Sequence, residues 1–204
     1  MEKTLSREEY NEQRKQNVED KKLQIIDAAQ KLFLTKGLDN VTMGDIMTAT
    51  NTSRASMYRY FPSIHPIAFE VQYRMLKEIF GDLKRTRPDM QKPKERVKEG
   101  LTILVDKFHQ HIEAYNYISM FDYFYAESYP DEKLSSDYLS FLGHLMFDEE
   151  PDGEQLGEYS DLVVTADVIF SYLQKIAHEQ SKKTQAADYK HDLLLVRQMI
   201  DKVF

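Results

Sequence analysis

The stretch TMGDIMTATNTSRASMYRYF, residues 42–61, carries the local signals of two short helices joined by a tight turn. Thr42 is a favourable N-cap residue, and Asp45 follows three positions later, which is the spacing of a capping box. Asn51 tolerates the left-handed backbone conformation that a turn between helices requires. The side chains predicted to point inward from the first helix are Met43, Ile46, Met47 and Ala49.

A second helix is predicted over residues 54–61, with Ser53 as its N-cap. Two helices joined in this way form a helix-turn-helix, whose second helix enters the major groove of DNA. Arg54 is placed to contact either a guanine edge or a phosphate, and both interpretations are open. Tyr58 and Tyr60 are placed either to contact phosphates or to pack within the small domain. The predicted DNA-contacting residues are Thr42, Ser53, Arg54, Ala55, Ser56, Tyr58, Arg59, Tyr60 and His65.

The segment IIDAAQKLFLTKG, residues 25–37, comes before this pair of helices, which ends in Tyr-x-Tyr-Phe. Together these motifs resemble the DNA-binding domain of the TetR family of bacterial transcription regulators, over residues 21–66. The matching positions are Ala29, Leu32, Phe33, Gly37, Thr42, Ile46, Ser53, Tyr58, Tyr60 and Phe61. The resemblance implies a variable C-terminal helical domain that binds a small effector.

Three positions depart from the family pattern. Asn51 stands where the family has a turn glycine, and Met47 replaces the usual alanine. Ile64 stands where the family usually has a phosphate-binding lysine. Either His65 or the helix N-terminus itself is expected to take over that phosphate contact, because a helix start attracts anions.

The charge is unevenly distributed along the chain. The formal net charge is −7, which by itself argues against a nucleic-acid partner. Residues 21–66, however, carry six Lys and Arg against three Asp, a net +3, whereas residues 67–204 carry 17 basic and 25 acidic residues, a net −8. A basic module on an acidic body suits a protein that contacts DNA with one face only.

Residues 1–20 form a polar N-terminal extension with four basic and six acidic residues. Ser6 and Glu9 have the spacing of a capping box, so a helix is expected to start near Arg7 and to continue into the next helix. The extension is interpreted as solvated, because its acids outnumber its bases. The alternative is an arm whose basic side chains, Arg7, Arg14 or Lys15, assist DNA binding.

Helical periodicity dominates the rest of the chain, and no strand pattern is present. The predicted helices are Lys21–Lys36, Pro66–Arg87, Lys94–Ala114, Tyr115–Ser128, Asp131–Phe147, Tyr159–Gln180 and Asp188–Val203. A loop is expected over Asp148–Gly157, which holds Pro151 and two glycines. The predicted fold is therefore all-α, with a three-helix DNA-binding domain at residues 21–66 and a larger helical effector-binding and dimerisation domain at residues 67–204.

Aromatic residues cluster in the second domain, where they line either an effector pocket or an ordinary core. The candidate effector-binding residues are Phe108, Tyr117, Phe121, Tyr123, Phe124, Tyr138 and Phe141. His109 and His111 are two positions apart and diverge on a helix, and His144 has only Asp148 near it in sequence. No metal site and no cofactor are expected.

The last two predicted helices, within residues 159–204, are candidates for a homodimer interface built as a four-helix bundle. The apolar face of the first consists of Leu162, Ala166, Ile169, Phe170, Leu173, Ile176 and Ala177. The apolar face of the second consists of Leu193, Val196, Met199, Ile200, Val203 and Phe204. The alternative is that both faces serve only the core of one subunit.

Enzyme classes find little support, because the chain has no Gly-rich phosphate loop, no G-x-S-x-G or H-E-x-x-H motif and no cysteine. No apolar run approaches the length of a membrane span, and residues 1–20 lack an apolar signal core, so a cytoplasmic location is expected. The sequence predicts a homodimeric transcription regulator that binds a pseudo-palindromic DNA operator, most simply a repressor released by a small molecule. The alternatives are a helical ligand-binding protein with a weakened or lost DNA reader, and a helical enzyme with an unrecognised site.

Overall fold

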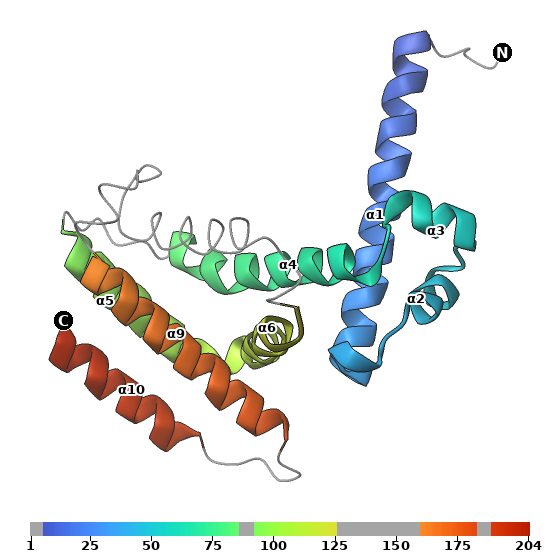
Figure 1. Cartoon of the computed structure of the whole chain (residues 1–204). Coiled ribbons are helices and arrows are strands. Elements are labelled where there is room, and N and C mark those ends of the chain that lie inside the picture. Colours follow the sequence, from blue (N-terminus) through green and yellow to red (C-terminus); the bar gives the residue numbers. More distant parts are fainter. Residues whose placement is uncertain (1–5, 86–91, 126–159, 183–188) are drawn as a thin grey trace. The chain divides into compact units, whose positions relative to one another are not determined.

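The structure is a computed structural model that describes residues 6–85, 92–125, 160–182 and 189–204 (Figure 1). These residues form eight α-helices and two short 3-10 helices, without a strand among them, which confirms the all-α class. The chain divides into two compact units, Met1–Val71 and Gln72–Phe204. The predicted helix Asp131–Phe147 and loop Asp148–Gly157 lie outside the described residues.

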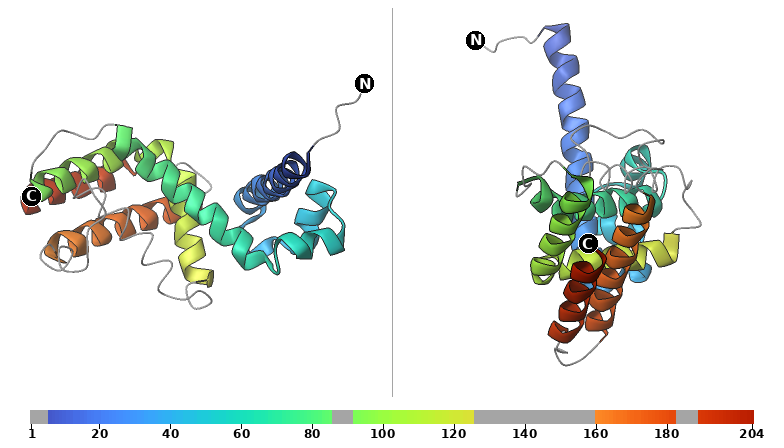
Figure 2. Two further views of the ribbon diagram at one scale, coloured as in Figure 1. Left: turned by 90° about the horizontal axis from the view of Figure 1, so that it is seen from above. Right: turned by 90° about the vertical axis from the view of Figure 1, so that its left-hand side faces the viewer.

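Helix α1, Arg7–Lys36, runs without a break from the polar extension into the first core helix. Its start is the predicted capping box, in which the Ser6 hydroxyl accepts from the Glu9 amide and the Glu9 carboxylate accepts from the Ser6 amide at 2.7 Å. Its end is Gly37, at φ 90°, a conformation that favours glycine. The N-terminal part of α1 extends beyond α2 and α3, which lie on one side of it (Figures 1 and 2).

The 3-10 helix η1, Leu38–Asn40, leads into α2, Met43–Thr50, and α3, Arg54–Tyr60. They share a buried core with α1, and its fully buried members include Ile25, Ala29, Ile46 and Met57. Of the α2 side chains predicted to point inward, Ala49 is wrong, because it is exposed. Thr50 is buried instead. Thr50 follows Ile46 by four positions on the same face, and its hydroxyl donates to the Ile46 carbonyl at 2.8 Å, so burial leaves no polar atom unpaired.

Helix α4, Ile64–Arg85, begins two residues earlier than predicted, so Pro66 lies in its first turn. Proline is tolerated there because the backbone amides of the first turn have no acceptor within the helix. The boundary between the two units falls inside this helix. Its apolar positions at steps of three and four are buried, and they include Ile67, Val71, Met75, Ile79 and Leu83.

The single helix predicted over Lys94–Ala114 is wrong. The structure has α5, Pro93–Asp106, then the 3-10 helix η2, Phe108–Gln110, and then α6, Ile112–Tyr125. Phe108 is fully buried, with its ring 5.2 Å from that of Tyr115 and 5.4 Å from that of Tyr189. The break therefore lets one large side chain pack against both rings, and no proline or glycine in the sequence announces it.

Helices α9, Ser160–Ser181, and α10, Lys190–Val203, end the chain, with α9 packed on α5 and α6 and α10 packed on α5. The α9 face predicted for dimerisation is core of a single subunit instead, because the other helices of the same chain cover it. Its buried members are Ala166, Ile169, Phe170, Leu173, Ile176 and Ala177. On α10, Val196 and Ile200 are likewise buried.

Candidate nucleic-acid interface

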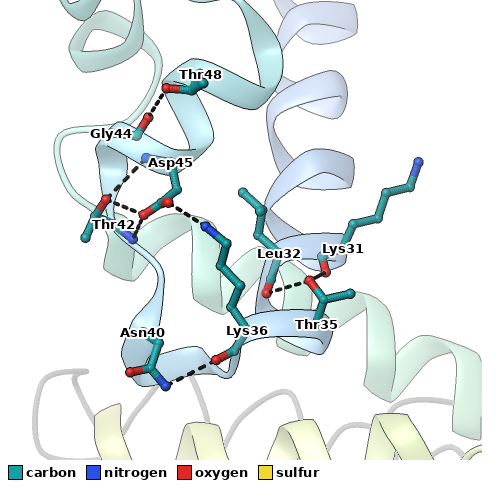
Figure 3. A network of polar contacts seen from close by, with 9 residues as sticks. All are labelled: Lys31, Leu32, Thr35, Lys36, Asn40, Thr42, Gly44, Asp45 and Thr48. Carbon is teal, nitrogen blue, oxygen red and sulfur yellow. Dashed lines mark hydrogen bonds and ion pairs between the residues drawn. The ribbon is translucent and has the colours of Figure 1, made fainter.

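A network of polar contacts joins the end of α1 to the start of α2 (Figure 3). The Thr42 hydroxyl accepts from the Asp45 amide at 3.2 Å, and the Asp45 carboxylate accepts from the Thr42 amide at 2.9 Å, which is the predicted capping box. The Lys36 ammonium donates to the other carboxylate oxygen of Asp45 at 2.6 Å. Thr42, a predicted DNA contact, therefore also fixes the start of α2 and its position against α1.

The same network holds the pKa of the Asp45 carboxyl far below its ordinary value of 3.8, chiefly through the hydrogen bond from Lys36 and then through those from Thr42. Because the folded-state pKa is depressed, the stabilisation is fully present above the unfolded pKa and is lost as the pH falls toward the folded one. Asp45→Asn should therefore destabilise the protein at pH 7, and the difference from wild type should shrink below about pH 4. Urea unfolding of both proteins between pH 7 and pH 2 measures this; a difference that does not depend on pH would contradict it.

The turn between α2 and α3 is fixed by backbone conformation and by two buried threonines. Asn51 is the one described non-glycine residue at positive φ, at φ 46° and ψ 47°, as predicted. The hydroxyls of Thr50 and Thr52 lie 2.8 Å apart and are both buried, and the Thr52 amide donates to the Met47 carbonyl at 3.0 Å. The sequence analysis missed this threonine pair, although two threonines flanking a left-handed residue are visible in the sequence.

Helix α3 presents one face to solvent and buries the other. Ser53 caps it as predicted, accepting from the Ser56 amide at 3.3 Å. Met57 is fully buried and Tyr60 is half-buried. The exposed positions recur at helical spacing, and they are Arg54, Ala55, Tyr58 and Arg59. Small residues at the N-terminal end and longer cationic or aromatic ones behind them form a surface that fits against a groove.

The charge on this exposed face is positive throughout, since α3 contains two arginines and no acid. The Arg54 guanidinium lies 5.7 Å from the ring centre of Tyr58, which is 44% exposed, and the Arg59 guanidinium lies 5.3 Å from that of Tyr60. Each arginine is thus partly ordered by a cation–π contact while its donors stay accessible. Such donors suit phosphate oxygens or guanine edges.

The start of α4 lies in the same unit. Ile64 is its first residue, and both Ile64 and His65 are half-buried. The position at which the family pattern has a lysine thus offers a side chain that cannot pair with a phosphate. His65 and the helix start stay predictions for that contact.

The candidate effector residues do not form one group. Phe108, Tyr117 and Phe121 are buried in the second unit, whereas Tyr123 is 81% exposed and Phe124 is also exposed. Tyr138 and Phe141 lie outside the described residues. Tyr115, which belongs to the same aromatic cluster at residues 115–125, is fully buried, and its ring lies 5.4 Å from that of Phe170.

The Tyr115 hydroxyl has no hydrogen-bond partner among the described residues, and burial raises the pKa of this phenol. Tyr115→Phe should therefore raise the free energy of unfolding by about 1 kcal/mol, because it removes a buried polar atom that gave up its bonds to water. Tyr123→Phe is the matched control at an exposed site and should leave stability within about 0.5 kcal/mol. Chemical unfolding of the three proteins measures both changes; destabilisation by Tyr115→Phe would show that its hydroxyl is satisfied in solution.

A second surface lies on the outer side of α9 and α10. Val164, Val168 and Tyr172 recur at steps of four on α9 and are 61%, 55% and 36% exposed. A groove of about 530 Å³ runs between the two helices, and its lining residues are Asp167, Val168, Ser171, Tyr172, Lys175, Leu195, Val196 and Met199. This exposed apolar stripe is turned away from the buried stripe that the sequence analysis assigned to dimerisation.

His109 is exposed, whereas His111 is buried with its Nδ1 3.4 Å from the Glu78 carboxylate. Across the described parts of the chain, no three potential metal ligands gather into a group. No helix in those same parts combines the length and apolar character needed to cross a membrane.

Comparison with known proteins supports the resemblance inferred from the sequence. Residues 25–71 match the model of the family described as bacterial regulatory proteins, tetR family. Two uncharacterized HTH-type transcriptional regulators of Mycobacterium tuberculosis, from strains CDC 1551 / Oshkosh and ATCC 25618 / H37Rv, are each 30% identical over 78 residues. These residues are 38% of this chain and 39% of each relative, so the match spans about two fifths of the curated relatives.

Two solved structures share the fold over nearly the whole chain. A TetR transcriptional regulator from Rhodococcus sp. RHA1 has a TM-score of 0.63 at 16% identity, covering 93% of this chain and 97% of the other. The fatty acid degradation regulator FadR from Bacillus halodurans has a TM-score of 0.61 at 19% identity, covering 88% and 94%. At such identities the likeness concerns the fold alone. The proteins matched are regulators and not enzymes, in agreement with the predicted class.

Proposed function

We propose, from the match of residues 25–71 to the tetR family of bacterial regulatory proteins, that the chain is a homodimeric regulator that binds a pseudo-palindromic DNA operator. One observation carries the proposal: the exposed face of α3 is basic, and it is held by a capped, buried framework. Arg54, Tyr58 and Arg59 lie on that face, while Met57 anchors its back. A rigid support of this kind sets the register in which a helix meets the base edges.

The proposed dimer interface is the exposed stripe Val164, Val168 and Tyr172 on α9, with the neighbouring groove. Ser171 lies between Asp167 and Lys175, each four positions away. If α9 pairs antiparallel with its copy about a two-fold axis at Ser171, the small serine allows a close approach. Asp167 then faces Lys175 of the partner subunit, and the same pair forms again on the other side of the axis.

We further propose that the second unit binds a small apolar molecule that alters DNA affinity. The support is chemical: its core is rich in aromatic rings and contains the phenol of Tyr115. Ligand pockets are mostly apolar with a few placed polar groups. Such a ligand shifts the regulator only by its differential affinity for the two states, usually by about 5–150-fold.

Selection of binding sites from random DNA by the purified protein tests the main proposal. We expect enrichment of a pseudo-palindrome, bound with an affinity at least about 1000-fold above that for unrelated duplexes. Equal affinity for every duplex would instead favour a helical ligand-binding protein whose DNA reader is lost. That second function has one observation in its favour, the half-buried Ile64 at the position of a phosphate-binding lysine.

A further inference from the structure

The N-terminal extension is a charged helix whose two signs are separated. Because α1 continues without a break from Arg7, each side chain has a defined direction, about 100° from the previous one. All five bases from the start of α1 to residue 22 fall within about a third of the circumference, and they are Arg7, Arg14, Lys15, Lys21 and Lys22. The acids fall in the following third, and they are Glu8, Glu9, Glu12, Glu19 and Asp20.

This basic stripe points toward the side of α1 on which the helix-turn-helix lies. Ile25 follows Arg7 by five whole turns and Ala29 follows one turn later, and both are fully buried in the first unit. The Lys21 ammonium donates to the Thr50 carbonyl at the end of α2, at 3.2 Å. The stripe therefore begins at the helix-turn-helix and continues on the same side of α1 toward the start of that helix.

The bases at the far end of the stripe are accessible. Arg7, Arg14 and Lys15 are exposed, and within the described residues none of them forms an ion pair. Of the five bases, Lys22 alone forms an ion pair with another described residue, Glu19, at 3.1 Å. The guanidinium and ammonium groups thus stay available for an anionic partner.

A helix that is merely exposed to solvent has no need to place its bases and its acids on separate sides. A helix stabilised by its own surface charges mixes the two signs, because opposite charges four positions apart attract and like charges repel. Here Glu8 and Glu12 are like charges at that spacing, and the opposite charges at such spacing, which include Lys15 with Glu19, lie where the basic and acidic sides meet. The arrangement suits a partner that supplies negative charge on one side only.

We propose that the basic stripe of α1 contacts the DNA phosphates that flank each half-site. This inference rests on the proposed function and adds a second contact surface to it. From Arg7 to Lys21 the helix rises about 21 Å, comparable to about six base pairs of duplex. The acidic third of the helix then faces solvent, away from the DNA.

The test compares wild type with Arg7→Gln/Arg14→Gln/Lys15→Gln on two duplexes: the selected operator with about ten flanking base pairs on each side, and the same operator trimmed to its half-sites. On the long duplex the variant should bind at least about 10-fold more weakly at 100 mM salt. Its plot of log affinity against log salt should be less steep by about 5, as expected when three phosphate contacts are lost from each of the two subunits. On the trimmed duplex the two proteins should bind alike.

The matched control is Glu8→Gln/Glu12→Gln/Asp20→Asn, which changes the same number of charges on the opposite side and should bind no more weakly than wild type. Circular dichroism should show that both variants keep their helix content. An unchanged salt slope for the basic-stripe variant, with wild type still specific for the operator, would overturn this inference alone. Equal losses on both duplexes, or an equal loss in the control, would also overturn it, whereas failure of wild type to bind any duplex would overturn the proposed function too.

Discussion

Val168→Asp with Tyr172→Asp should convert the protein from a dimer into a folded monomer. Both side chains lie on the exposed stripe of α9, outside the buried face of this helix, so a single subunit should stay folded. In a dimer they would bury four carboxylates without partners. We expect the dissociation constant of the dimer to rise by at least about 1000-fold, or about 4 kcal/mol. Sedimentation at micromolar concentration measures the change.

Loss of the dimer should carry over to DNA. A monomer presents one α3, so its affinity for a pseudo-palindrome should fall to that for a single half-site. Tyr123→Asp is a suitable control, because Tyr123 is exposed on another helix and should leave both the dimer and its DNA affinity intact. A double variant that stays dimeric would exclude this face of α9 as the interface.

A charge exchange tests the orientation of the two α9 helices. Asp167→Lys alone should weaken the dimer, since it places like charges together at both symmetric positions, and adding Lys175→Asp should restore it. Failure of the second substitution to restore association would exclude an antiparallel pairing about Ser171. Charges at Ile169 or Leu173 would not serve, because both side chains are fully buried in one subunit and a charge there should unfold the chain.

The two apolar faces of α9 have different surroundings, which the sequence does not predict. Periodicity identifies an apolar stripe, but it does not say whether the stripe meets its own chain or a copy. The stripe containing Ile169 was the more apolar and became core. Val164, Val168 and Tyr172 form a shorter stripe of only three residues, so periodicity favours the other face.

The helix-turn-helix could be predicted almost residue by residue for a physical reason. Thr42 with Asp45, Asn51 and Ser53 act through contacts within three or four positions, and the structure confirms each of them. The break between α5 and α6 could not be predicted in this way. It depends on the packing of Phe108 against Tyr115 and Tyr189, and Tyr189 is 81 positions further along the chain.

Neither the sequence nor the fold determines which atoms of DNA a single residue contacts. Exposure separates Arg54, Tyr58 and Arg59 from Met57, but it does not distinguish a base contact from a phosphate contact. Ser53 and Ser56 illustrate the difficulty, since their hydroxyls already lie 3.1 Å from each other within the helix cap. A DNA contact by either residue would share an oxygen with that cap.

Arg54→Ala should distinguish a base contact from a phosphate contact at the cation that begins α3. Arg54 is the first residue of the helix, and its neighbour Ala55 leaves room for the groove wall. If Arg54 reads a guanine, its loss should cost about 1–3 kcal/mol in each half-site and relax preference at one position per half-site. Over two half-sites this corresponds to a roughly 30-fold to 10⁴-fold weaker complex. Repeating the binding-site selection with the variant measures both effects.

Arg54→Lys separates charge from geometry at the same position. A lysine keeps the positive charge but not the two-pronged donor pattern that matches a guanine edge. For a base contact we therefore expect Arg54→Lys to lose specificity nearly as fully as Arg54→Ala, while affinity for unrelated duplexes and its salt dependence stay close to wild type. Tyr58→Phe, which removes one hydroxyl from the same face, should instead weaken binding to all sequences alike. If Arg54→Ala also weakened every duplex equally and lowered the salt slope by about one per half-site, Arg54 would be a phosphate contact, and sequence would have to be read elsewhere on α3.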